Sequence, residues 1–335
     1  MEVETDEGVR GVGSGDTMDG FAAFEHLFVG EDPLRIARHV RALETIGFHA
    51  GRYWPLEAAL WDVIGQVTGQ PVSVLFGGAA DSLPAYASTG ERRSPEERAA
   101  SAVDIADAGF RAMKIRIDRT RIDEGLAAVR AVREAVGDRL SLMVDLNAGW
   151  RMAGDTTPAL DVVSARRLSE ALAELDVVWL EEPLDGADLR GHAALRDGGR
   201  IRIAGGEMTR TMAELLATLD ADAFDVYQPD VVLAVGMLRA RTVAELALAR
   251  NQWFTPHTWT NGIGLLANLH VAAGVGGGPF LEVPYDPPGW TPERRDFMLE
   301  EPVGVDPDGV LRVPAAPGLG SRLSREARAA LDAAR

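Results

Sequence analysis

The chain opens with two segments in which apolar residues recur every three or four positions. In residues 32–47 these positions are Leu34, Ile36, Val40, Leu43 and Ile46. Residues 55–68 repeat the spacing, and Pro55 suits the first turn of a helix. Both segments are therefore predicted to form amphipathic helices. Residues 2–12 precede them and are predicted to form a strand that runs into a turn.

From about residue 84 onward, short β-rich runs alternate with helical patterns. The runs cover 85–88, 112–117, 141–145, 177–181, 201–205, 223–228, 252–256 and 280–283. Helices are expected after a capping box at Ser94–Glu97, and then over about 123–136, 159–175, 188–197, 211–219, 236–250 and 262–273. Parallel strands need crossover helices, so this alternation predicts a parallel α/β barrel. An open doubly wound sheet is the alternative.

Polar residues gather where these predicted strands end. Lys114 and Arg116 are two positions apart and share one face of their strand, whereas Met113 and Ile115 take the other face. The remaining strand-end residues of this kind are Asp145, Asn147, Glu181, Glu182, Glu207, Asp230, His257 and Glu282. In a parallel barrel the chemistry lies at the carboxyl ends of the strands, so these side chains are expected to converge.

Three of these acids point to a metal site. Asp145, Glu181 and Glu207 follow three successive strands. Carboxylates brought together in one barrel mouth need a counter-charge, and a hard divalent cation such as Mg²⁺ takes oxygen ligands of this type. For one such acid alone, capping the next helix is the simpler explanation. Three such acids at adjacent strand ends favour a metal site over helix capping.

Asp230 and His257 are predicted on neighbouring strands. A carboxylate that orients an imidazole gives a general base, although a single histidine at a strand end can also be a packing residue. The other histidines lie in helical or connecting segments and are interpreted as structural: His26, His39, His49, His192 and His270.

A glycine motif offers a rival interpretation. Residues 262–267 read Gly-Ile-Gly-Leu-Leu-Ala, and Glu282 lies further along at a strand. A dinucleotide fingerprint, however, needs its first glycine directly after a strand at the start of a βαβ unit. Here several residues separate the strand from Gly262, so the motif is interpreted as the start of a helix, one that could face an anionic substrate.

Composition narrows the functions further. The 335-residue chain has a net charge of −17, which disfavours nucleic acid and anionic membranes as partners. It contains no cysteine, which excludes thiolate chemistry, and Lys114 is the one lysine among 34 basic residues. An acidic start and the lack of 18 consecutive apolar residues predict neither a signal peptide nor a transmembrane helix, and the expected location is the cytoplasm.

Motifs spread over nearly the whole chain resemble the enolase superfamily, in its mandelate racemase-like subgroup. They read VETDEGVRGVG, PLEAALWDVIGQVTGQPVSVLFGG, MKIRID, MVDLNAGW, WLEEPL, IAGGE, YQPD, TPHTW, FLEVP and PGLG. The resemblance lies in their order and spacing together. It implies a modified (β/α)7β TIM barrel with an α+β capping domain, Mg²⁺, and abstraction of the proton α to a carboxylate.

The resemblance also implies a domain division. Residues 1–80 would form the N-terminal part of the capping domain, residues 81–300 the barrel, and residues 301–335 a segment that returns to the capping domain. Met1 stands only two residues before the first match, where the family has an earlier strand and a specificity loop. The capping domain is therefore expected to lack them, and a longer chain is expected to be more stable and faster.

Roles follow the motifs residue by residue. Asp145, Glu181 and Glu207 match the metal ligands, and Asp230 with His257 matches the base dyad. Lys114 matches the residue that holds the substrate carboxylate, Glu282 the acid that hydrogen-bonds the enediolate, and Asn147 a substrate contact. Arg116 departs from the pattern, because it stands where the subgroup often has a second lysine base and arginine is a poor base.

The resulting hypothesis is a Mg²⁺-dependent dehydratase that converts an aldonate or aldarate to a 2-keto-3-deoxy acid. The alternatives are a racemase, epimerase or cycloisomerase acting on a related hydroxy acid, and a homologue with impaired catalysis. The expected partner is a small-molecule carboxylate, with no nucleic acid or membrane, and the resemblance implies a homo-oligomer.

Overall fold

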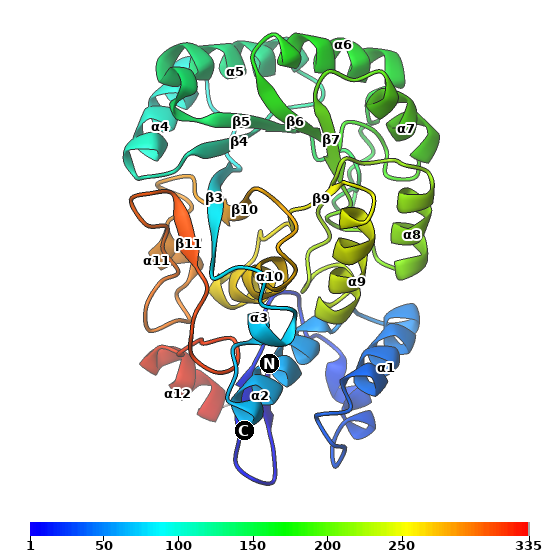
Figure 1. Ribbon diagram of the computed structural model, residues 1–335, viewed down its shortest axis with the longest axis vertical. Helices are drawn as coiled ribbons and strands as arrows, with labels where there is room; N and C mark the ends of the chain where they lie inside the picture. The colour runs from blue at the N-terminus through cyan, green and yellow to red at the C-terminus, as the bar shows by residue number, and fades with distance from the viewer. Residues whose placement is uncertain (334–335) are drawn as a thin grey trace.

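The computed structural model describes residues 1–333 and contains a curled sheet of eight parallel strands (Figure 1). The strands are β3 (Ser82–Thr89), β4 (Ala112–Arg116), β5 (Ser141–Asp145), β6 (Val177–Glu181), β7 (Arg202–Gly205), β8 (Val226–Tyr227), β9 (Trp253–Phe254) and β10 (Leu281–Pro284). Neighbours follow chain order from β3 to β9, and the last strand, β10, pairs with the first, β3. This sequential order confirms the barrel over an open doubly wound sheet, whose order would reverse.

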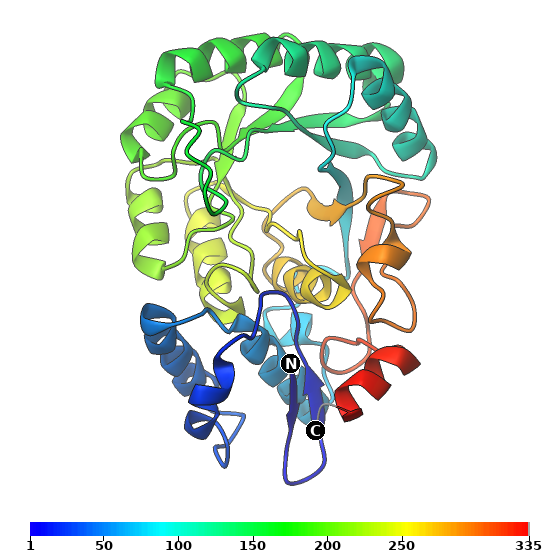
Figure 2. The ribbon, with the colours of Figure 1, turned by 180° about the vertical axis from the view of Figure 1, so that it is seen from behind.

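Helices lie outside the curled sheet, between successive strands (Figures 1 and 2). They are α4 (Pro95–Asp107), α5 (Ile122–Val136), α6 (Val162–Ala173), α7 (Leu189–Asp197), α8 (Met212–Asp220), α9 (Met237–Leu248) and α10 (Gly262–Val275), and η2 (Gly137–Arg139) is a short 3₁₀ turn. Each predicted helix is present with its ends shifted by a few residues. The capping box at Ser94 and Glu97 is confirmed, since each side chain bonds the other's backbone N–H.

The N-terminal region forms a separate small layer beneath the barrel. Residues 2–12 are not one strand but an antiparallel hairpin of β1 (Glu2–Glu4) and β2 (Arg10–Val12). The intervening turn carries Gly8 at φ +80°, where glycine is the residue with least strain. The helical elements that follow are η1 (Phe21–Leu27), α1 (Ile36–His49), α2 (Trp54–Thr68) and α3 (Val72–Leu75).

The C-terminal segment returns to this small layer. It contains α11 (Pro292–Arg295), β11 (Val310–Arg312), which pairs antiparallel with β3, and α12 (Arg325–Ala333). Arg328 on α12 pairs with Glu2 at 2.5 Å, and Leu319 donates its N–H to Asp62 on α2 at 2.7 Å. The N-terminal hairpin and α12 therefore lie close together below the barrel (Figure 2).

A cavity of about 720 Å³ lies along β1, between η1 and α2, and Phe21, Leu56 and Leu60 contribute to its lining. The expectation that a strand is lacking in this region stays a prediction, as does the division into domains.

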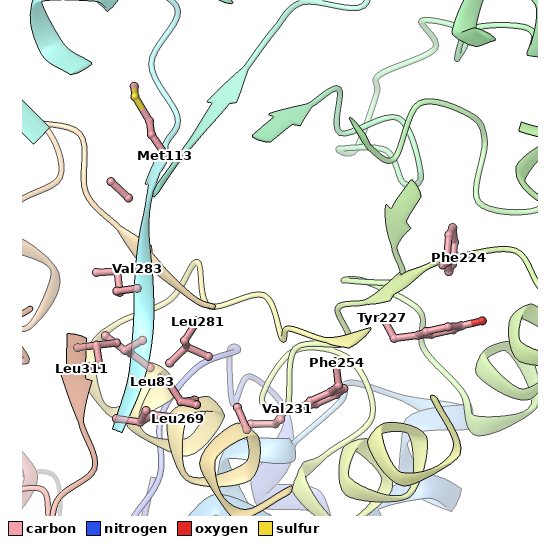
Figure 3. Packing of buried hydrophobic residues seen from close by; sticks show 14 of the residues in the cluster. Leu83, Met113, Phe224, Tyr227, Val231, Phe254, Leu269, Leu281, Val283 and Leu311 are labelled. Atoms are coloured by element: carbon pink, nitrogen blue, oxygen red, sulfur yellow. The ribbon is translucent and has the colours of Figure 1, made fainter. Parts of the chain in front are cut away.

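Two apolar layers hold the barrel together. Strand residues that face outward pack against the helices, including Met113, Leu281 and Val283 (Figure 3). The opposite faces form an inner cluster of Tyr86, Ala112, Met143, Trp179, Ala204 and Val226. Because strand residues alternate between faces, the next inward position on three of these strands is a residue of the predicted site: Lys114 after Ala112, Asp145 after Met143 and Glu181 after Trp179.

No helix within residues 1–333 combines the length and the apolar character that crossing a membrane requires.

Candidate active site

Three carboxylates converge directly above the inner apolar cluster. Asp145 ends β5, Glu181 ends β6, and Glu207 follows β7 two residues after Gly205. One oxygen from each of these side chains lies within 4.8 Å of the others, and all three residues are at most 2% exposed. The register explains the meeting, since Asp145 is paired directly with Glu181 across two parallel strands. The structure thus brings together the three acids that the sequence predicted.

The chemistry of this triad fits a hard divalent cation. Burial raises the pKa of Glu181 to about 8, and the like charges of Asp145 and Glu207 add to that effect while Lys114 opposes it. Glu207 also leaves its buried Oε2 without a hydrogen-bond partner. A divalent cation that takes oxygen ligands would neutralise these crowded carboxylates and would coordinate the unpaired oxygen of Glu207.

Each carboxylate of the triad is oriented by neighbouring donors. Asn147 donates its N–H and its side-chain Nδ2 to Asp145, at 2.7 and 2.5 Å. Trp150 donates Nε1 to Glu207 at 2.5 Å. Glu181 Oε2 accepts from Trp179 and Gln228, at 3.1 and 3.0 Å. Supporting donors of this kind fix ligand geometry in metal sites.

Asn147 therefore lies against a carboxylate of the triad, and its substrate contact stays a prediction. Trp150 and Gln228 were missed by the sequence analysis. Both belong to the quoted motifs, in MVDLNAGW and YQPD, but nothing in their residue type marked them as partners of a ligand.

Lys114 is enclosed by acids at the centre of the site. Its Nζ lies 2.6 Å from Glu181, 2.8 Å from Glu282 and 3.6 Å from Asp145. Burial alone would lower the pKa of Lys114, but these carboxylates outweigh it and hold the pKa well above its ordinary value. The one lysine of the chain is therefore a fixed positive charge.

Glu282 is the partner of Lys114 on β10. Burial would raise its pKa, but Lys114 and His257 lower it to about 2. Glu282 also accepts the N–H of Thr258 at 2.8 Å. It is thus a carboxylate in this structure. Its expected role as a hydrogen-bonding acid toward an enediolate stays a prediction.

Asp230 and His257 form the expected dyad. The Nδ1 of His257 lies 2.9 Å from Asp230 Oδ2, and Asp230 is itself held by the N–H groups of Val232 and Leu233. The other imidazole nitrogen, Nε2, faces the triad at 3.7 Å from Glu207 Oε2. An imidazole fixed at one nitrogen presents the other to a substrate in a defined tautomer.

The charge state of His257 depends on the neighbouring acids. Burial would lower its pKa, but Glu207, Glu282 and Asp230 raise it to about 10. A cation on the triad would offset the charge of Glu207 and so return the imidazole toward the neutral form that a base requires.

Arg116 and Glu182 complete the strand-end residues. Arg116 ends β4 with its guanidinium carbon 5.5 Å from the centre of the Trp259 ring. Glu182 is 4% exposed at φ +44°, and burial beside Glu207 and Asp145 raises its pKa well above the ordinary value.

The glycine motif begins α10, as the sequence analysis expected. Asn261 caps this helix and accepts the N–H groups of Ile263 and Gly264, at 3.1 and 3.2 Å. A Cβ on Gly262 would lie 2.7 Å from Asp296, and one on Gly264 would lie 2.1 Å from the Thr260 hydroxyl. These glycines permit close packing, which confirms a helix start over a dinucleotide fingerprint.

A family model described as enolase C-terminal domain-like matches residues 97–327. D-galactarolactone cycloisomerase of Agrobacterium fabrum is 29% identical over 98% of this chain and 89% of its own length. L-talarate/galactarate dehydratase of Salmonella typhimurium is 28% identical over 98% of this chain and 80% of its own. Among solved structures, the 3,6-anhydro-D-galactonate cycloisomerase of Zobellia galactanivorans superimposes with a TM-score of 0.83, at 27% identity over 97% of this chain and 91% of that one.

Proposed function

Because the chain belongs to the enolase C-terminal domain-like family of the enolase superfamily, we propose that it is a Mg²⁺-dependent dehydratase of sugar acids. The observation that carries the proposal is the meeting of a buried carboxylate triad with an oriented histidine base. The Nε2 of His257 and Oε2 of Glu207 are 3.7 Å apart. A base and a cation site this close can act on one small acid, and relatives over nearly the full chain are named for sugar acids.

Asp145, Glu181 and Glu207 would hold the cation. When bound, it supplies positive charge to the substrate carboxylate and to the charge that grows there as the proton leaves. Lys114, which contacts Glu181 and Glu282, supplies a second and permanent positive charge next to the cation site. Both charges are fixed in place before the reaction, which is what makes such stabilisation effective in a buried site.

His257 would remove the α-proton. Its Nε2 receives the proton from the carbon next to the carboxylate, while Asp230 keeps Nδ1 occupied and stabilises the imidazolium that forms. The electron pair then expels the β-hydroxyl, which takes a proton and leaves as water. The protonated His257 would supply that proton. The enol that remains rearranges to a 2-keto-3-deoxy acid, so atoms and charge balance.

Arg116 favours elimination over inversion of the α-carbon. Inversion generally needs a second base on the opposite face of the substrate. Arg116 matches that position in the family motif, and an arginine side chain stays protonated in proteins at neutral pH, so it is a poor base. Elimination needs no second base.

Cycloisomerisation is the second candidate, because two of the proteins compared above are named cycloisomerases. The same α-proton abstraction would then expel an oxygen that belongs to a ring of the substrate, and no water would be released.

A panel of aldonic and aldaric acids tests the proposal. Purified protein with Mg²⁺ is expected to convert at least one acid to a product that reacts with semicarbazide. EDTA and the substitution His257→Asn should each abolish that product. Turnover that persists in EDTA, or in His257→Asn, would contradict the proposed chemistry. Ring opening of a sugar lactone or anhydro acid without release of water would favour the second candidate.

A further inference from the structure

The last residue of β4 carries a guanidinium group that its surroundings leave without an acidic partner. Arg116 lies two residues beyond Lys114, on the same inward face of the strand. In the part of the chain that the structure describes, it forms no ion pair and no hydrogen bond, and its enclosed Nε is unsatisfied. Its terminal nitrogens are not enclosed. In a chain of net charge −17, an arginine left unpaired beside buried carboxylates indicates a place for a further anion.

Trp259 holds this guanidinium group from one side. The guanidinium carbon lies 5.5 Å from the centre of the indole ring, within the range of a cation–π contact. The indole is itself fixed: its Nε1 donates to Ser88 at 2.7 Å, and the ring of Trp290 meets it edge-on at 4.4 Å. A Cβ on Gly90 would lie only 2.5 Å from the indole, so the backbone closes the remaining side.

Contact with an aromatic face leaves the N–H bonds of arginine available. These bonds lie in the plane of the guanidinium group, and two of them match the two oxygens of a carboxylate. Because a hydrogen bond and a ring contact already hold the Trp259 indole, less side-chain freedom is lost when an anion binds.

Lys114 is less available for the same task. Its single ammonium group already contacts Glu181 and Glu282 at 2.6 and 2.8 Å, with Asp145 at 3.6 Å. It is 2% exposed. The cation of β4 that is open to an incoming acid is therefore Arg116.

We propose that Arg116, held on Trp259, binds the carboxylate of the substrate and gives the site its preference for acids over neutral sugars. This inference rests on the proposed function, because it takes the substrate to be a sugar acid. It assigns to Arg116 a binding role that the resemblance gives to Lys114.

Binding without turnover provides the test. In the His257→Asn protein with Mg²⁺, calorimetry would compare the acid that the panel shows to be consumed fastest with its primary amide. The acid is expected to bind more tightly. Arg116→Gln should weaken acid binding roughly 10- to 100-fold and leave amide binding nearly unchanged. Arg116→Lys should recover part of the loss, since it keeps the charge but not the paired N–H groups.

Two further measurements separate binding from folding. Guanidinium chloride at millimolar concentration should restore part of the acid affinity of Arg116→Ala, whereas sodium chloride at equal ionic strength should not. The affinity for Mg²⁺ should be nearly unchanged in Arg116→Gln, because the Arg116 side chain forms no ion pair or hydrogen bond with the described residues of the triad. A third measurement tests the aromatic contact: Trp259→Leu should weaken acid binding by about 2- to 5-fold.

A matched control exists at the other end of the barrel. Arg202, at the start of β7, lies 3.7 Å above the ring of Trp253 and repeats the arginine–tryptophan pair away from the site. Arg202→Gln should leave acid binding unchanged.

Equal acid affinity in the Arg116→Gln and Arg116 proteins, with turnover of the acid intact, would overturn this inference alone. Consumption of no acid in the panel would overturn the proposed function and this inference with it.

Discussion

At the scale of single residues, the site concentrates charge that the folded chain cannot balance by itself. Five acids of the barrel mouth are at most 2% exposed: Asp145, Glu181, Glu207, Asp230 and Glu282. The positive charges paired with these acids are Lys114 and, when protonated, His257. A cation on the triad would reduce the excess of negative charge. Binding of the cation and stability of the folded protein are therefore linked.

Asp145→Asn tests the triad with almost no change in volume. We expect the affinity for Mg²⁺ to fall by more than the roughly 10- to 100-fold typical of a supporting residue, and turnover to be lost. In EDTA the variant should be at least as stable as the original protein, because one repelling charge is gone. Calorimetry with Mg²⁺ and urea unfolding measure the two effects. Full activity in the variant would contradict the proposal that Asp145 is a ligand of Mg²⁺.

Trp150→Phe tests the support of the triad. The substitution keeps an aromatic ring but removes the N–H that Glu207 accepts at 2.5 Å. Mg²⁺ affinity should fall about 10-fold, at the lower end of such effects. Trp61→Phe is the matched control, since Trp61 also donates to a glutamate, Glu57 at 3.2 Å, away from the site. Equal losses in both variants would show that the Trp150 bond has no special role.

Residue-level prediction worked where strand geometry decides the outcome. Asp145, Glu181 and Glu207 could be placed together because parallel strands end at one edge and side chains alternate between faces. Trp150 and Gln228 could not, because they reach the triad through loop conformation and side-chain rotamers, which have no period in the sequence. The orientation of Asn147 toward Asp145 depends on its positive φ and was equally hidden.

At the scale of elements, α10 joins the barrel to the small layer beneath it. All but its last residue, Val275, are buried, so it has no polar stripe that would set its orientation from sequence. His270 supplies the polar link within it. Its Nδ1 accepts the N–H of Ser73 in α3, and its Nε2 donates to the carbonyl of Leu319 in the C-terminal segment.

His270 makes stability depend on pH. Burial lowers its pKa to about 4, below the ordinary 6.5, so the folded protein keeps the imidazole neutral. The unfolded chain binds a proton more readily between pH 4 and 6.5. The neutral His270 therefore contributes about 3 kcal/mol to the free energy of unfolding above pH 6.5, and this contribution is lost as the pH falls toward 4. Urea unfolding from pH 7 to 4 should show this slope, and His270→Gln should flatten it. A slope that is unchanged in His270→Gln would assign the acid sensitivity to other groups.

Element prediction failed in one informative place. The hairpin of residues 2–12 was expected as a single strand, because Thr5 to Gly8 contains no hydrophobic alternation that would mark where a turn separates two strands of three residues. The barrel strands were predictable, since short β-rich runs alternate with crossover helices along the chain.

At the scale of the whole molecule, the fold and the general chemistry followed from sequence. The alternation of strands and helices favoured a parallel barrel over an open doubly wound sheet, and the strand ends indicated where the candidate site lies. Prediction stopped at the way the chain ends meet, since Leu319 with Asp62 and Arg328 with Glu2 are contacts between residues more than 250 positions apart. No local pattern encodes such contacts.

The molecule as a whole should be stabilised by the cation that the site would hold. At a free Mg²⁺ concentration 100 times its Kd, binding to the folded state alone would add about 2.7 kcal/mol to the free energy of unfolding. Differential scanning calorimetry in Mg²⁺ and in EDTA should show a higher Tm with the ion. Asp145→Asn should remove most of this difference. The same Tm in both solutions for the original protein would count against a buried cation site.

The most direct test of the proposed reaction is a proton NMR time course in deuterated water. The protein, Mg²⁺ and one sugar acid that it consumes are expected to give a 2-keto-3-deoxy acid with deuterium at carbon 3. The remaining substrate should contain no inverted, deuterium-labelled epimer, because Arg116 cannot act as the second base. Rapid appearance of that epimer without any keto acid would contradict dehydration by a single base and would show that the protein is a racemase or epimerase.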